Sequence, residues 1–312
     1  MTTLSTRKLS DNLGTEILEV DLAELSDATF EAIRTLWQQD PLLLLRRQSL
    51  TESELLAFSK RFGDLDQNTI QDFNDEAIVE AHAPELLFIS NLLFPDGSKV
   101  GGLSNSEVVW HTDLIYRAHP ASGTIFYGIE MPDGTGQTSY CNMAHAYRTL
   151  PEDLRSRANG AQARCKLFTD APLSMSMRPH RAEGYQLETQ SDAGAQAIDE
   201  RTPEVIQNLV VENASTGERS LYMSPNHTTA LEGLCEEEAR ALFDALLEHA
   251  LQPENIYCHQ WRNGDVVLWD NVRLLHRRES FGDHTPRLAK RTTVYMDPKY
   301  FAVSHGETAT PV

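Results

Sequence analysis

The chain has 312 residues, of which 40% are hydrophobic and 23% charged, the composition of a globular protein with one large domain or two ordinary ones. Its formal net charge of −19 repels phosphate backbones and argues against nucleic acid as a partner. No stretch resembles a signal peptide or a membrane span, and the four cysteines form no CxxC pair, so we expect a cytoplasmic protein with reduced thiols.

The first part of the chain contains two helical patterns around one strand. Apolar residues recur at helical spacing over residues 22–39, where Ser26 or Asp27 could cap the helix. The apolar run at 41–47 predicts a buried strand, and a second helix is expected at 51–63.

Capping residues mark the second helix, and a long irregular segment follows it. Thr51 stands at the start of the helix, Glu54 completes a capping box, and Gly63 is expected to end it. The residues that follow mix short apolar pieces with Asp, Asn, Gly and Pro, and only one strand is expected among them, at 86–90. A segment with so little regular structure is typical of a lid or substrate loop, which we place at about 66–106.

From residue 108 onward, short β-rich runs recur along the chain. Seven of them are expected to be strands: 108–116, 122–130, 137–142, 219–224, 255–261, 265–271 and 288–296. Helices are expected to interrupt them at 143–159 and 235–251. Many short strands with few helices are typical of a β-sandwich or jelly roll rather than a parallel α/β sheet. The chain also lacks a phosphate-binding glycine loop and the G-x-S-x-G motif of many hydrolases.

Three residues form a candidate metal site. On a strand, His111 and Asp113 would point to the same face, because side chains alternate with a period of two. His276, just beyond the strand expected at 265–271, would add a third ligand from a distant part of the chain. Two histidines and one carboxylate leave open positions on Fe(II), although zinc hydrolases use similar sets. A strand histidine bonded to a neighbouring aspartate is the purely structural alternative.

Two arginines follow the last of these residues. On a strand, Arg287 and Arg291 share one face, and if that face lines a cavity both guanidinium groups point into it. Because an unpaired buried charge is costly, each group needs an anionic partner, and the forked donor set suits a carboxylate. The pattern indicates two anions in the cavity, with an internal acid such as Asp270 as the alternative partner of Arg291.

These motifs resemble those of the taurine dioxygenase and chlorophenoxyacetate dioxygenase family of Fe(II)/2-oxoglutarate oxygenases. WHTD at 110–113 is similar to the first iron motif of that family. LWDNVRLLHRR at 268–278 is similar to the segment that carries its distal histidine. Arg287 and Arg291 lie eleven and fifteen residues after that histidine, which fits the family spacing.

The resemblance runs from about residue 10 to residue 297. Thr138 lies 27 residues after the first iron histidine, as the family pattern requires, and AFSKRFGDL at 57–65 also resembles family sequences. Residues 215–234 look like the exposed hairpin of the family and its following turn. The resemblance implies a single domain over 1–312, mainly β with flanking helices, folded as a double-stranded β-helix (jelly roll).

The resemblance also implies roles for these residues. The three metal-site residues would bind Fe(II), Arg287 and Thr138 would hold the distal carboxylate of the co-substrate 2-oxoglutarate, and Arg291 would lie near the primary substrate. With O2, such an enzyme hydroxylates a C–H bond of a small anionic organic molecule and releases succinate and CO2. Halogenating relatives lack the carboxylate ligand, so Asp113 favours hydroxylation.

Asn91 and Tyr116 are further candidates for substrate contacts, because both lie in segments expected to shape the pocket. Four other histidines are treated as structural or surface residues: His145, His180, His227 and His259. Of these, His227 is the first to check for proximity to the cavity. We expect a homo-oligomer, either a dimer or a tetramer. The alternatives are desaturation or other oxidative tailoring of a biosynthetic intermediate at the same iron site and, more remotely, a zinc hydrolase or a non-catalytic jelly-roll binding protein.

Overall fold

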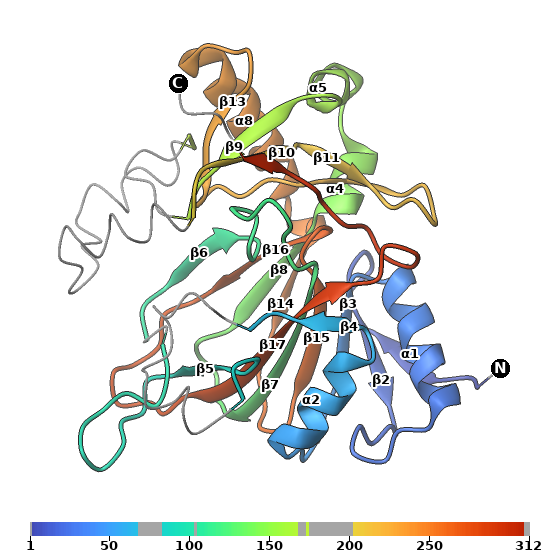
Figure 1. Cartoon of the computed structure of the whole chain (residues 1–312), viewed down its shortest axis with the longest axis vertical. Helices are drawn as coiled ribbons and strands as arrows, with labels where there is room; N and C mark the ends of the chain where they lie inside the picture. Colours follow the sequence, from blue (N-terminus) through green and yellow to red (C-terminus); the bar gives the residue numbers. More distant parts are fainter. Residues whose placement is uncertain (1, 68–82, 103–104, 168–172, 175–201, 309–312) are drawn as a thin grey trace.

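Two β-sheets face each other in the computed structural model, which describes residues 2–67, 83–102, 105–167, 173–174 and 202–308 (Figure 1). The larger sheet contains, in spatial order, β1 (Ser5–Lys8), β2 (Thr15–Leu18), β3 (Leu42–Leu45), β15 (Val266–Asp270), β7 (Gly123–Glu130), β17 (Leu288–Met296) and β4 (Gly63–Leu65), with β5 (Leu87–Ser90) also paired to β17. Its neighbours are antiparallel except for β2 and β3, which run parallel.

The smaller sheet is antiparallel throughout and carries most of the residues of interest. Its strands are, in spatial order, β14 (Ile256–His259), β8 (Thr138–Asn142), β16 (Leu274–Arg278) and β6 (Val108–His111). Phe126 and Trp269 of the larger sheet meet Tyr140 and Leu274 of the smaller sheet in one apolar cluster. The two sheets therefore stack face to face, and the predicted mainly β jelly roll with flanking helices is confirmed.

Helices cover the outer faces of both sheets. On the larger sheet, α1 (Asp27–Gln39) and α2 (Glu52–Lys60) bury Trp37 and Phe58 in a cluster that includes Leu268. On the smaller sheet, α4 (Met143–Thr149) and α8 (Glu236–Ala250) share a cluster with Leu275 of β16. Each sheet therefore packs its inner face against the other sheet and its outer face against helices, and both contacts are apolar.

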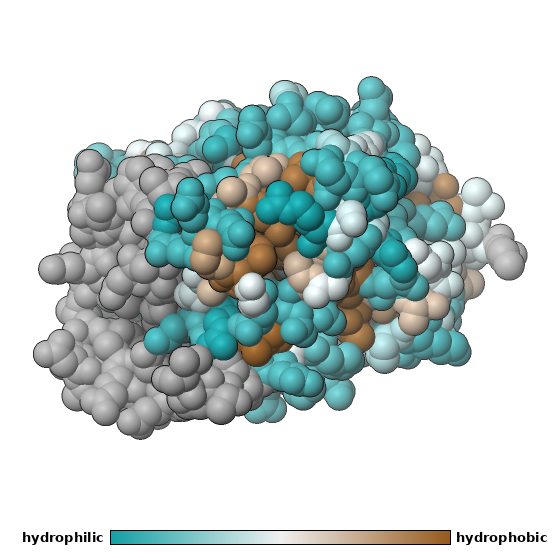
Figure 2. All heavy atoms as spheres, turned by 90° about the horizontal axis from the view of Figure 1, so that it is seen from above, coloured by the Kyte–Doolittle hydropathy of each residue, from teal (hydrophilic) through white to brown (hydrophobic). Residues whose placement is uncertain are grey.

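The end of the molecule around α8 is built from small elements. These are α5 (Glu152–Ala158), η1 (Pro253–Asn255), the sheet of β13 (Thr228–Leu231), β9 (Gln162–Cys165), β10 (Val205–Asn208) and β18 (Glu307–Thr308), and the hairpin of β11 (Val210–Glu212) and β12 (Arg219–Leu221). Seen from this end, the described surface is mostly hydrophilic around a central group of hydrophobic residues (Figure 2). Among the described residues, every helix is too short or too polar to cross a membrane.

Several predicted helix and strand boundaries are confirmed, and others needed correction. Ser26 caps α1, and the Thr51–Glu54 capping box begins α2. The helix predicted over 143–159 is instead two helices, because Pro151 cannot continue a helix and forces Leu150 into an extended conformation. Four predicted strands are shorter than expected by three residues or more: those at 41–47, 108–116, 219–224 and 255–261.

Gly63 does not end a helix, as the sequence pattern suggested. The helix α2 ends at Lys60, and Gly63 begins β4 with a φ of 155°. A β-carbon at this position would collide with the carbonyl oxygen of Tyr295 in β17. Glycine is therefore required here for the close approach of two strands rather than for a helix terminus.

Candidate active site

The three predicted metal ligands converge at the end of the smaller sheet. His111 ends β6, and His276 lies directly opposite it in the adjacent strand β16. The Nε2 atoms of His111 and His276 lie 3.8 and 4.0 Å from the carboxylate oxygens of Asp113. One potential ligand atom from each residue lies within 4.8 Å of the others, which could place all three around one metal ion.

The reason that Asp113 reaches the site differs from the expected one. The strand β6 ends at His111, so Asp113 lies in the following turn and strand alternation does not orient it. The next residue, Leu114, has a φ of 59°, a left-handed conformation that costs about 1–3 kcal/mol for a residue with a side chain. Thr112 fixes this turn by donating a 2.6 Å hydrogen bond to the carbonyl of Asn271. His276 was expected just beyond the strand at 265–271, and it lies within the next strand, β16.

Both oxygens of the Asp113 carboxylate have a protein donor. Arg291 donates to Oδ1 at 3.0 Å, and the Thr124 hydroxyl donates to Oδ2 at 3.2 Å. Thr124 accepts a hydrogen bond from the Asn271 amide, so its own hydrogen is directed to the carboxylate. Burial alone would raise the pKa of Asp113, but Arg291 and the two imidazoles outweigh burial and hold this pKa well below its usual value. Asp113 is therefore an ionised, oriented carboxylate.

The two histidines are in the form that binds metal. Burial is the main cause that lowers the pKa of His111 and of His276, so both imidazoles are neutral near pH 7. The Nδ1 atom of His111 lies 2.8 Å from the carbonyl oxygen of Val109. Because a carbonyl can only accept, Nδ1 carries the hydrogen and Nε2 presents its lone pair toward the site.

A pocket that is open to solvent extends from the two histidines into the space between the sheets. Its polar lining comprises Thr138, Tyr140, Arg278, Arg287 and Arg291. The predicted placement of Arg287 and Arg291 on one inward face is therefore consistent with the structure. Arg278 and Tyr140 were not identified from the sequence, although each lies two residues from a recognised site residue on a strand and so shares its face.

Arg287 is a buried cation without an acid partner. Its side chain is 2% exposed, it donates to the carbonyl of Gly136 at 3.0 Å, and no carboxylate of the described residues pairs with it. The Nε atom has no hydrogen-bond partner within the described part of the chain. Burial, together with the charge of Arg278, lowers the pKa of Arg287 to about 9. A guanidinium in this state suits an incoming anion, as a bidentate carboxylate would provide.

Thr138 has a hydroxyl hydrogen available beside this arginine. The indole Nε1 of Trp261 donates to the Thr138 oxygen at 2.9 Å. Because an indole nitrogen is only a donor, the hydroxyl hydrogen must be directed elsewhere, and Thr138 lines the pocket. The residues present thus fit a dicarboxylate that reaches the metal ligands at one end and Arg287 at the other.

The three predicted substrate contacts differ in their surroundings. Arg291 lines the pocket and pairs with Asp113, not with Asp270. Both polar atoms of the Asn91 side chain are bound to the backbone: the amide donates to the Thr285 carbonyl and the oxygen accepts from the Arg287 N–H, at 2.9 Å each. Tyr116 packs against the ring of His227 and is outside the pocket lining among the described residues. Their contacts with a substrate stay predictions.

The other histidines fit structural roles where they are described. His145 contacts the Asn255 side chain at 2.6 Å, and His259 lies 3.1 Å from the buried carboxylate of Asp265. His227 contacts the backbone carbonyls of residues 166 and 167 as well as the Tyr116 ring. His180 lies outside the described residues.

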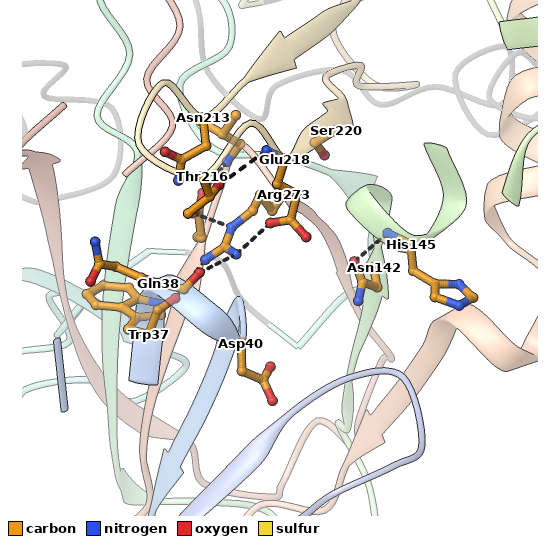
Figure 3. A network of polar contacts seen from close by, with 12 residues as sticks. Trp37, Gln38, Asp40, Asn142, His145, Asn213, Thr216, Glu218, Ser220 and Arg273 are labelled. Carbon is orange, nitrogen blue, oxygen red and sulfur yellow. Dashed lines mark hydrogen bonds and ion pairs between the residues drawn. The ribbon is translucent and has the colours of Figure 1, made fainter. Parts of the chain in front are cut away.

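A second buried arginine, Arg273, lies three residues before the metal-site histidine His276. Arg273 lies in the turn between β15 and β16 and is 1% exposed. It donates to the carboxylates of Asp270 and Glu218, at 2.8 and 3.0 Å, and to the carbonyls of Trp37 and Gln38 (Figure 3). These bonds connect the strand that carries a metal-site histidine to the end of α1 and to the β11–β12 hairpin.

Comparisons with known proteins agree with this geometry. The model of the family "Taurine catabolism dioxygenase TauD, TfdA family" matches residues 5–293. An "(S)-phenoxypropionate/alpha-ketoglutarate-dioxygenase" from Sphingobium herbicidovorans is 31% identical over 301 residues, covering 93% of this chain and 94% of the relative. A "Pentalenolactone F synthase" from Streptomyces avermitilis is 29% identical over 307 residues, which is 94% of each chain.

Among solved structures, a putative alpha-ketoglutarate-dependent taurine dioxygenase from Burkholderia xenovorans aligns with a TM-score of 0.74 and 26% identity, covering 99% of this chain and 100% of that one. These matches extend over nearly the whole chain and favour an oxygenase over a zinc hydrolase or a non-catalytic binding protein. The chain belongs to the TauD/TfdA family and is a dioxygenase that uses Fe(II), 2-oxoglutarate (alpha-ketoglutarate) and O2.

Proposed function

We propose that this enzyme hydroxylates a C–H bond of a small organic substrate that carries an anionic group. In this proposal His111, Asp113 and His276 hold the iron, while Arg287 and Thr138 bind the distal carboxylate of 2-oxoglutarate. The observation that carries it is the guanidinium of Arg287 in the pocket of the triad, which has no acid partner among the residues that the structure describes. A protein keeps such a buried cation where an anionic ligand completes it.

The residues prepare the site for this chemistry. Iron with its co-substrate and O2 supplies the oxidising power when bound. The neutral imidazoles and the ionised Asp113 present lone pairs without first losing a proton. Arg291 and Thr124 hold both carboxylate oxygens, which keeps the ligand oriented. Apolar walls such as Phe126 exclude water from the interior of the pocket.

The position of Arg291 favours the proposal that the substrate is anionic. It lines the pocket beside the metal ligands, one of its N–H groups binds Asp113, and its Nε has no partner among the described residues. A guanidinium has five N–H donors, so a second anion can share it. The relative named for (S)-phenoxypropionate takes, by its name, an organic acid. An orienting role toward Asp113 alone is the alternative for Arg291.

Succinate release tests the substrate class. We expect small carboxylates and sulfonates, aryloxy acids first, to stimulate succinate formation from 2-oxoglutarate, while uncharged analogues of the same shape do not. Arg291→Gln should retain 2-oxoglutarate binding and slow uncoupled turnover but lose the stimulation by acids. Equal stimulation by acids and their uncharged analogues would rule out the anionic class, and loss of co-substrate binding in Arg291→Gln would favour the purely orienting role.

The similarity to a pentalenolactone F synthase supports a second outcome, oxidative tailoring of a biosynthetic intermediate other than hydroxylation. Mass analysis of the product decides between them, because hydroxylation adds one oxygen atom and desaturation removes two hydrogens.

We further propose a single oxygenase domain over residues 1–312, a cytoplasmic location, and a homo-oligomer of two or four chains. Light scattering of the purified protein measures the last of these.

A further inference from the structure

Tyr140, in the middle of β8, has a buried hydroxyl group without a hydrogen-bond partner among the described residues. The residue is 0% exposed and lines the pocket that contains Arg287. The rings of Trp269 and His276 lie 5.6 and 6.3 Å from its own ring and restrict its position. Buried tyrosine hydroxyls usually have a partner, because a polar group that loses water needs a replacement.

The strand register places this hydroxyl along the path of a ligand. Tyr140 and Thr138 share one face of β8, because they are two positions apart. In the neighbouring strand β16, His276 lies opposite Tyr140 and Arg278 lies opposite Thr138. A molecule that extends from the metal ligands toward Thr138 therefore passes Tyr140.

The charges in the pocket determine what the hydroxyl can bind. A phenol carries one donor hydrogen, so the unpartnered Tyr140 hydroxyl can donate it to an acceptor in the pocket. Because Arg287 lacks an acid partner among the described residues, the ligand of this pocket supplies a carboxylate.

We propose that the Tyr140 hydroxyl donates a hydrogen bond to the distal carboxylate of 2-oxoglutarate, as a third donor beside Arg287 and Thr138. This inference rests on the proposed function, which assigns that carboxylate to the latter two residues. Four lone-pair sites on a carboxylate are enough for a forked guanidinium and two hydroxyl donors. Tyr140 would then be a co-substrate-binding residue that sequence motifs do not mark.

Calorimetric titration tests this without turnover. The Mn(II)-loaded protein is titrated with 2-oxoglutarate in the absence of oxygen, as wild type, Tyr140→Phe and Tyr147→Phe. We expect Tyr140→Phe to weaken binding about tenfold or more, the usual effect of losing a hydrogen bond to a charged group. Tyr147→Phe is the matched control, because this buried tyrosine bonds Asn159 and does not line the pocket, so the affinity should be unchanged. Unchanged affinity in Tyr140→Phe would overturn the inference.

Two further measurements separate this inference from others. With 2-oxobutyrate, which lacks the distal carboxylate, wild type and Tyr140→Phe should bind equally; a loss there would place the hydroxyl at the metal end instead and overturn the assignment. The ligand-free Tyr140→Phe protein should melt at the same temperature or higher, because an unpartnered buried hydroxyl is removed, so a lower melting temperature would contradict its unpartnered state. If wild type itself failed to bind 2-oxoglutarate, the proposed function would fail rather than the role of Tyr140.

Discussion

Arg273 and Arg287 are both almost fully buried, yet they have opposite surroundings. Arg273 has two carboxylates and two backbone carbonyls as acceptors, and the carboxylates of Asp270 and Glu218 outweigh burial and raise its pKa. Arg287 has one carbonyl acceptor and the repulsion of Arg278, and burial lowers its pKa. Burial alone therefore does not separate a structural cation from one that awaits a ligand; the set of partners does.

Removing the structural arginine should have the largest effect on stability. Arg273→Met leaves Asp270, which is 0% exposed, as an unpaired buried carboxylate, and breaking a buried pair in this way costs about 3–5 kcal/mol. Denaturant unfolding of the metal-free protein measures the loss. Glu218→Gln is the control, because Glu218 is partly exposed and its removal should cost at most about 1 kcal/mol. A loss below that of the control would mean that Arg273 does not stabilise this corner.

Removing the pocket arginine, Arg287, should affect ligand binding rather than stability. Arg287→Met leaves no described acid unpaired, so the unfolding free energy of the ligand-free protein should not fall, while 2-oxoglutarate binding should weaken by about 2–5 kcal/mol. Arg287→Lys keeps the charge but loses the fork, so its affinity should be intermediate. Binding is measured by calorimetry and stability by denaturant unfolding. Strong destabilisation of Arg287→Met with intact 2-oxoglutarate affinity would make Arg287 a structural residue like Arg273.

A smaller effect should come from the residue that holds Arg287. The Asn91 side chain accepts from the Arg287 backbone N–H and donates to the Thr285 carbonyl, so Asn91→Ala should loosen the start of β17. We expect 2-oxoglutarate affinity to fall by about 0.5–1.5 kcal/mol, the usual value of one hydrogen bond. Ser98→Ala is the control in the same loop, because its hydroxyl contacts only Asp96 in the described structure. Equal affinities for the two variants would indicate that Asn91 does not position Arg287.

The sequence predicted the fold and the position of the site because local patterns carry both. Short apolar or β-rich runs marked nine of the eighteen strands in the described structure, and capping residues marked the starts of α1 and α2. Strand alternation also placed Arg287 and Arg291 on one inward face, and both line the pocket, although Arg287 precedes β17 and the pairing of β17 with β7 shifts register between Leu288 and Ala289. It failed for Asp113, because β6 ends at His111 and Asp113 lies in the following turn, where no glycine or proline signals the change.

The amino-acid sequence by itself determined which groups are available: two imidazoles, a carboxylate, and several arginines on strands that alternate inward and outward. Only the tertiary structure decided which of them are paired. Arg273 meets Asp270 and Glu218 because a turn, a helix end and a hairpin come together around it. Within the described structure Arg287 meets aromatic rings rather than acids, which is why we propose that a ligand supplies its anionic partner. The physical reason is that alternation along a strand fixes the direction of a side chain, whereas its partners come from segments far apart in the chain.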